Sequence, residues 1–377
     1  MSIKDELSAR LEDIHAHGYP FPVVRAVLRA HELPTAQGWE TQIEKIKDLK
    51  HEELIYAQAL LKRLHLSLAL YSEKAFQLFK ISAGAASTLG DILTNYKPTN
   101  AFAARFPYDL SETELRAATR TINVSASLNE EDIDEFDEDG EARFFDSTTF
   151  SSRAIPTVAL SGKRYKTLRA EYDINDLKSV PSALQDYDQI VAIRRIAFQF
   201  NHVVAVHETS GRYFVELRLD CSSSWLAGEL EKHFLFVKGW TNQLFKSKTG
   251  TESLLKGAVN LFPSIAALYN EPEGRVRQAG SSSPSASVRD EKMRRSSLDL
   301  RQDPFHKHGV QATGKFNGHN LLKTWDSTVY ETTPNLVLPG TLSIASSTEP
   351  YLAHGEIHGA ACQSDYLLVL EHLIATL

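Results

Sequence analysis

Two runs of β-prone residues between positions 189 and 220 form the clearest pattern in the chain. They flank the pair Ser210-Gly211, and two such runs around a two-residue turn that contains glycine predict a β-hairpin. Because side chains alternate between the two faces of a strand, this turn fixes which residues share a face. One face is apolar, pairing Val206 with Val215, Val204 with Leu217 and His202 with Leu219. The other face is mixed, pairing His207 with Phe214, Ala205 with Glu216 and Val203 with Arg218.

The first 98 residues follow a helical pattern instead. Leu7, Leu11 and Ile14 recur at helical intervals before a break at residues 17–20, and Pro22 can open a second short helix. Helices of about ten residues with short turns favour a small bundle. A DNA-binding helix-turn-helix is the alternative, but no recognition helix rich in Arg, Asn or Gln stands out.

A longer helix is predicted over residues 54–80. Its apolar residues are spaced three and four apart, which forms a seam for a partner helix. A partner within the same domain is favoured, because sustained coiled coils usually need more heptads and opposed flanking charges. Binding of another protein, or of a second copy, through this seam is the alternative. The seam consists of Ala57, Leu61, Leu64, Leu68, Tyr71, Ala75 and Leu78.

The remainder of the chain alternates strand-like and helical segments. Together these patterns predict an α+β protein with a helical N-terminal domain, a central mixed α/β domain built on the antiparallel hairpin, a mobile Ser-rich basic loop, and a small β-rich module with a C-terminal helix. The expected boundaries are 1–98, 99–272, 273–308 and 309–377. Within these parts we expect strands at 157–160 and 165–172 around a Ser161-Gly162 turn, a helix at 254–269, strands at 336–338 and 342–344, and a helix at 364–377.

Composition places the chain among ordinary folded proteins. With 377 residues, 42% hydrophobic and 24% charged, it can form two or three domains with real cores. No run approaches the roughly 18 apolar residues of a membrane helix, and the first residues lack the apolar core of a signal peptide. The two cysteines, Cys221 and Cys362, provide no disulfide framework. A cytoplasmic location without membrane contact is therefore expected, and no cofactor is predicted.

Net charge changes the picture only locally. The chain carries −7 overall, so nucleic-acid binding would need a local basic patch. Residues 274–308 hold eight Lys and Arg against four acidic residues, which is +4. The interleaved Asp290, Glu291 and Asp299 slightly favour a solvated, neutralised loop over phosphate binding. The candidate phosphate-binding residues are Arg289, Lys292, Arg294, Arg295, Arg301 and Lys307.

Two further patterns have the residue types of metal sites. Residues 354–362 include His354, His358 and Cys362, which would share one face of a helix and suit zinc. Two glycines favour a strand, however, on which His354, Glu356 and His358 share a side, and structural polar residues are the preferred interpretation. The second pattern is an acidic run, and a solvated loop is preferred over a calcium loop. Its calcium-type spacing involves Glu135, Asp137, Asp139, Gly140 and Asp146.

The polar side of the predicted hairpin is the weak catalytic candidate. Glu216 followed by Arg218 resembles the carboxylate and base of metal-dependent nucleases, yet arginine stays protonated and cannot act as a general base. A cross-strand ion pair or a solvated face is therefore preferred. The candidate residues are His207, Glu208, Glu216 and Arg218.

The sequence thus favours a non-catalytic cytoplasmic binding protein or accessory subunit of a larger assembly. Its basic segment would contact nucleic acid, and its helical seam would contact a protein. The alternatives are a metal-dependent nuclease or hydrolase that uses the hairpin carboxylates, and a purely structural homo-oligomer.

Overall fold

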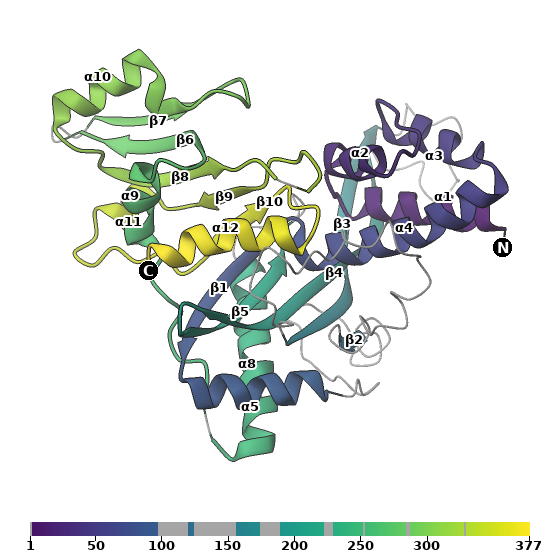
Figure 1. Ribbon diagram of the computed structural model, residues 1–377, viewed down its shortest axis with the longest axis horizontal. Coiled ribbons are helices and arrows are strands. Elements are labelled where there is room, and N and C mark those ends of the chain that lie inside the picture. Colours follow the sequence, from purple (N-terminus) through teal and green to yellow (C-terminus); the bar gives the residue numbers. More distant parts are fainter. Residues whose placement is uncertain are drawn as a thin grey trace.

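The computed structural model describes residues 2–96, 120–123, 156–173, 189–221, 229–251, 253–283, 287–327 and 329–377. Within them, ten strands form one antiparallel sheet in the order β2-β3-β4-β5-β1-β10-β9-β8-β6-β7 (Figure 1). Helices pack against this sheet, so the predicted α+β class is confirmed. The strands are β1 (Lys74–Ile81), β2 (Arg120–Asn123), β3 (Thr157–Asp173), β4 (Gln189–Thr209), β5 (Arg212–Asp220), β6 (Arg275–Ser282), β7 (Val288–Lys292), β8 (Gly318–Thr324), β9 (Asn335–Leu338) and β10 (Gly355–His358).

Helices cover both faces of the sheet (Figure 1). Figure 1 shows α5 and α8 on one side, α12 on the other, and the N-terminal helices as a separate group. Among the helices in the described part of the chain, none has both the length and the hydrophobicity needed to cross a membrane. The helices are α1 (Ile3–Ala16), α2 (Phe21–Ala30), α3 (Trp39–Lys47), α4 (His51–Tyr71), α5 (Ala83–Thr94), α8 (Glu229–Thr249), α9 (Phe262–Asn270), α10 (Pro304–Thr313), α11 (Leu342–Ala345) and α12 (Gln363–Ala375), with a short 3-10 helix, η5 (Leu300–Gln302).

The central hairpin has the predicted register. Strands β4 and β5 are joined by Ser210 and Gly211, whose φ angles of 52° and 72° are those of the tight turn that matches strand twist. The paired residues are Val206 with Val215, Val204 with Leu217, His207 with Phe214, Ala205 with Glu216 and Val203 with Arg218.

Of the two alternatives expected for the mixed face of this hairpin, the cross-strand pair is present, between His207 and Glu216, and the solvated face is not. Val204, Val215 and Leu217 pack with residues of α5 and α8, as the apolar pattern required. The opposite face, however, is covered by Tyr366 of α12 and by Tyr71 at the end of α4, so Glu216 and Arg218 are also buried. A hairpin sequence specifies which residues share a face, but elements far along the chain decide whether that face meets water.

The N-terminal helices form their own hydrophobic cluster. Leu7, Leu11 and Ile14 of α1 are fully buried with Val24 and Leu28 of α2 and with the apolar side of α4. The first two predicted helices are therefore confirmed. The seam residues Ala57, Leu61, Leu64 and Leu68 lie inside this cluster and are fully buried, so their partners belong to the same chain.

The predicted helix over residues 54–80 is too long. Helix α4 ends at Tyr71, and the last seam residues belong to β1. Glu73 has a positive φ of 52°, which a continuing helix cannot accommodate. Beyond it, Phe76 and Leu78 face one cluster while Ala75 and Phe79 face another, which is the alternation of a strand. Over such a short apolar segment the spacing of a helix and that of a strand cannot be told apart, so the strand β1 was predicted as a continuation of the helix.

Several other boundaries differ from the predictions. Strand β3 runs without interruption through Ser161-Gly162, because it pairs along its whole length with β4. The helix predicted over 254–269 begins only at Phe262, and the strand predicted at 342–344 is the short helix α11. Strand β9 and helix α12 match the predicted strand at 336–338 and C-terminal helix.

The segment from 273 to 308 contains β6, β7, η5 and the start of α10. Strands from this segment and from the C-terminal residues join the sheet through the pairing of β10 with β1. The predicted domain boundaries remain predictions, and the acidic run with its calcium-type spacing lies outside the described residues.

The hairpin turn yields a stability prediction. We expect Gly211→Ala to lower the free energy of unfolding by about 1 kcal/mol, because alanine is strained at positive φ. Gly239→Ala is the matched control, since Gly239 lies in α8 with open space around its added methyl group. That variant should raise stability by about 0.5–1 kcal/mol in the same urea denaturation experiment. Equal effects of the two changes would contradict the turn geometry.

Candidate functional site

The basic segment lies at the end of the sheet formed by β6 and β7, next to α10 (Figure 1). Five of its predicted phosphate-binding side chains are exposed, and within the described residues no ion pair joins any of them to a carboxylate. They form what we call the basic surface. Its members are Arg289, Lys292, Arg294, Arg295 and Lys307.

Arg301, the sixth predicted residue, is placed differently. Its guanidinium contacts Asp299, with 2.6 Å between Nη2 and Oδ2, and also donates to the carbonyl oxygen of Gly274 at 2.7 Å. Asp299 is buried, and the hydrogen bonds from Arg301 counteract burial and lower the pKa of its carboxyl group. Arg301 therefore braces the start of β6 and is not part of the basic surface.

The interleaved acidic residues are engaged away from the basic surface. Asp290 accepts a hydrogen bond from Asn320 at 3.0 Å, and Glu291 contacts Nδ1 of His306 at 2.5 Å. Asp303 caps the N-terminus of α10 by accepting from the backbone N–H of His306. With Asp299 held by Arg301, the four acidic residues of the segment each have another partner.

The hairpin candidates meet in a buried network under α12. Oε2 of Glu216 lies 2.5 Å from Nε2 of His207 and accepts from Nε of Arg218 at 2.7 Å. The hydroxyl of Tyr366 donates to Oε1 of Glu216 at 2.5 Å. The Arg218 guanidinium also lies over the rings of Tyr366 and Tyr71, with 4.4 and 5.2 Å to their centroids.

Electrostatics in this network favour a fixed ion pair. Burial by itself would raise the pKa of Glu216, but Arg218 and His207 outweigh burial and lower this pKa to about 2. Glu216 is 0% exposed, so a substrate-bound magnesium ion has no access to its oxygens. Glu208, the fourth candidate, is exposed and is not among the partners of Glu216. The geometry supports a structural role for the network.

A second buried ion pair was not predicted from the sequence. The Lys74 ammonium at the start of β1 contacts the carboxylate of Asp220 at the end of β5 and donates to the carbonyl oxygen of Asn201 at 3.0 Å. Burial lowers the pKa of Lys74 although Asp220 opposes this effect. Only the pairing of β1 with β5 makes these residues neighbours, and that pairing leaves no local signal in the sequence.

The segment 354–362 forms strand β10 followed by a turn, as the strand interpretation predicted. Glu356 and His358 share one side of it, with 2.9 Å between Oε2 and Nε2. Cys362, in contrast, precedes α12 and is buried in the cluster of the N-terminal helices. The structure therefore does not bring Cys362 to the two histidines, because the strand does not repeat every four residues as a helix would.

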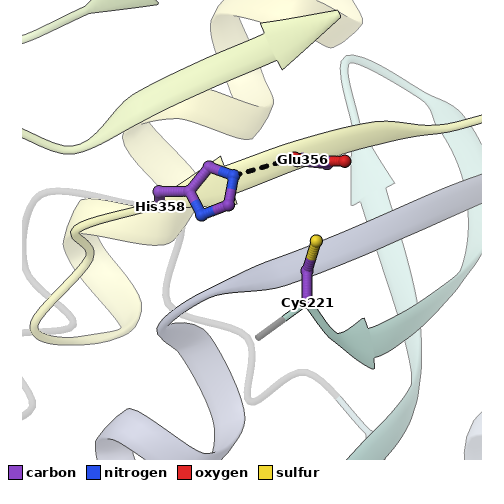
Figure 2. Close-up of side chains that lie close together, drawn as sticks. All are labelled: Cys221, Glu356 and His358. Carbon is purple, nitrogen blue, oxygen red and sulfur yellow. Dashed lines mark hydrogen bonds and ion pairs between the residues drawn. The ribbon is translucent and has the colours of Figure 1, made fainter. Parts of the chain in front are cut away.

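Cys221, and not the predicted Cys362, is the cysteine that lies beside His358. It follows β5 directly, and its sulfur points toward Glu356 and His358 on β10 (Figure 2). The ligand-type atoms of these three residues all lie within 4.8 Å of one another. Nδ1 of His358 is 2.6 Å from Oε2 of Glu73, so the imidazole lies between two carboxylates. His354 packs near Phe234 with 6.2 Å between ring centroids.

The protonation of this cluster argues against a nucleophilic thiol. Burial and the neighbouring Glu356 raise the pKa of Cys221 well above its ordinary value, whereas catalytic cysteines have a lowered pKa. Burial would lower the pKa of His358, but hydrogen bonds with Glu356 and Glu73 outweigh it and raise this pKa to about 10. A thiol in this environment stays protonated unless a cation binds.

The chain matches no protein-family model, no curated protein and no solved structure in comparisons with all three. The interpretation of these sites therefore depends on their geometry and chemistry alone.

The buried network yields a double-mutant prediction. Glu216→Leu leaves the Arg218 guanidinium without its carboxylate, and Arg218→Met leaves Glu216 without its strongest partner. Each change should lower the free energy of unfolding by about 3–5 kcal/mol, because an uncompensated charge stays buried. The double variant should lose clearly less than the sum of the two, measured by urea denaturation. Additive losses would contradict a coupled pair.

Acid should weaken the same network. The folded-state pKa of Glu216, about 2, lies below the value of about 4.3 for a free glutamate, so its ionised form stabilises the fold above that range. This contribution should be lost as the pH falls from about 4.3 toward 2. The stability difference between the wild type and Glu216→Leu should accordingly shrink over that interval in denaturation curves. A difference that does not change with pH would show that Glu216 is not held ionised.

Proposed function

We propose that the protein is a non-catalytic binding protein, or an accessory subunit of a larger assembly, that contacts nucleic-acid phosphates through the basic surface. The observation that carries this proposal is the exposure of Arg289, Lys292, Arg294, Arg295 and Lys307 without carboxylate partners in the described residues. Cationic side chains that stand free in solvent can each displace a counterion from a phosphate backbone.

The way in which the neighbouring acidic residues are used supports this proposal. A charged segment is neutralised when its own acids pair with its bases. Here Glu291 contacts His306, Asp299 contacts Arg301, and Asp303 caps a helix. The acidic residues of the segment therefore do not neutralise the five cations of the basic surface, although the whole chain carries −7. Long-range repulsion from that net charge is screened beyond about 8 Å at physiological ionic strength.

An exposed aromatic ring adds a preference for single strands. Phe305 at the start of α10 is 69% exposed, and the Arg289 guanidinium lies over its ring with 5.5 Å to the centroid. Single-stranded nucleic-acid sites combine such rings, on which bases stack, with cations along the backbone. Bases stacking on Phe305 would bring their phosphates within reach of Arg289.

Binding is tested with fluorescein-labelled single-stranded and duplex DNA and RNA in anisotropy titrations across salt concentrations. We expect affinity to fall with a log–log slope of about −2 to −3.5 for a single strand, the value for three to five phosphate contacts. Arg294→Ala with Arg295→Ala should weaken binding at low salt and reduce this slope by about 1.4. Phe305→Ala should weaken single-strand binding more than duplex binding.

The matched control changes the same amount of charge elsewhere. Lys246 and Lys248 are exposed at the end of α8, so Lys246→Ala with Lys248→Ala lowers the net charge equally. This control should leave binding unchanged. If the control weakens binding as much as the Arg294 and Arg295 variant, or if affinity does not depend on salt, the proposal fails. Adding Mg²⁺ or Mn²⁺ tests the nuclease alternative, and we expect a shift in anisotropy without cleavage.

A further inference from the structure

Three chemically different metal-ligand donors converge where β5 ends beside β10. These are the sulfur of Cys221, a carboxylate oxygen of Glu356 and a ring nitrogen of His358, which all lie within 4.8 Å of one another (Figure 2). In a tetrahedral zinc site with bonds of about 2.0–2.3 Å, the ligand atoms are about 3.3–3.8 Å apart. The 2.9 Å contact between Nε2 of His358 and Oε2 of Glu356 would need to lengthen by only about half an ångström. The sulfur of Cys221, which lies at most 4.8 Å from the other two donors, would need to approach them by up to about 1–1.5 Å, and the ion would displace the protons of the thiol and of Nε2.

The donor set selects the class of ion. Calcium and magnesium are bound by oxygen ligands, and a site for either would not use a thiol and an imidazole. A thiolate together with an imidazole and one carboxylate suits a borderline-soft divalent ion such as Zn²⁺ or Co²⁺. Three protein ligands leave one tetrahedral position for water or for another small ligand.

Glu73 holds the imidazole in the orientation that metal binding requires. Its Oε2 is 2.6 Å from Nδ1 of His358, while its Oε1 accepts from the backbone N–H of Gly359 at 3.0 Å. Nε2 of His358 is thereby directed toward Glu356 and remains on the side of Cys221. A metal-bound histidine almost always donates its second ring N–H to a carboxylate or carbonyl in this way. Cys221 is tied to the same turn, because its N–H donates to the carbonyl oxygen of Glu73 at 2.8 Å.

We infer that Cys221, Glu356 and His358 form a binding site for a divalent transition-metal ion of the zinc class, with Glu73 as the carboxylate that orients His358. The site is partly open to solvent, since the Glu356 and His358 side chains are 21% and 23% exposed. An ion can therefore enter without unfolding of the sheet. This site shares no residue with the basic surface, so the metal-binding inference does not depend on the proposal of nucleic-acid binding.

Binding is measured on the full-length chain without a histidine tag, stripped with EDTA and titrated with Co²⁺. We expect one equivalent to bind and to give the sulfur-to-cobalt charge-transfer absorption of a thiolate ligand. Zn²⁺ should displace the cobalt and abolish this absorption. Cys221→Ser should remove the absorption and weaken binding more than about 100-fold, beyond the 10–100-fold typical of an orienting residue. Cys362→Ser, which changes the cysteine buried in another cluster, should retain both.

Two further measurements complete the test, and the second does not depend on how any variant folds. Glu73→Gln should retain the absorption but bind about 10–100-fold more weakly, as expected for a residue that acts through His358. In the wild-type chain, Zn²⁺ should slow alkylation of Cys221, located by peptide mass spectrometry, and EDTA should restore the rate. The inference is overturned if cobalt binds without thiolate absorption, if Cys221→Ser binds as tightly as Cys362→Ser, or if Zn²⁺ does not protect Cys221.

Discussion

Strand β1 pairs with β5 on one side and with β10 on the other, and the rest of the structure depends on this double pairing. It joins the central hairpin to the strands contributed by the last third of the chain, so that a single sheet results. Without β1, strands β5 and β10 would each present an unpaired edge, which folded proteins avoid. Residues separated by more than two hundred positions, such as Glu73 and His358, become neighbours only because β1 lies between these strands.

Strand β5 is buried on both faces, so each charged side chain on it needs a partner. Glu216 and Arg218 point toward α12, where the Tyr366 hydroxyl completes the carboxylate's hydrogen bonds. Asp220, at the end of β5, pairs with Lys74 at the start of β1. Buried ion pairs of this kind contribute little net stability, because desolvation offsets their attraction. They do penalise other registers, since a shift by one residue would turn these charges toward the apolar residues of α5 and α8.

The two proposed binding sites occupy different environments for a physical reason. Phosphate binding uses long, flexible cations at the end of the sheet, where β7 and α10 leave the side chains in solvent. Metal binding needs donors held in place, and Glu356 and His358 lie on the paired strand β10, while the backbone N–H of Cys221 donates to the carbonyl oxygen of Glu73. Orientation by Glu73 adds to that rigidity, because its carboxylate is itself anchored by the Gly359 N–H.

The sequence by itself determined the local features. Period-two alternation and the Ser210-Gly211 turn specified the register of the hairpin, and helical spacing located α1, α2 and α12, because these patterns depend on near neighbours in the chain. The strand character of residues 355–358 was also readable, and with it the shared side of Glu356 and His358. Tertiary structure alone decided that α12 covers Glu216, that residues 74–81 leave the helix to join the sheet, and that Cys221 rather than Cys362 lies beside His358. Those outcomes depend on which strands pair across long loops, and no interaction between sequence neighbours encodes that choice.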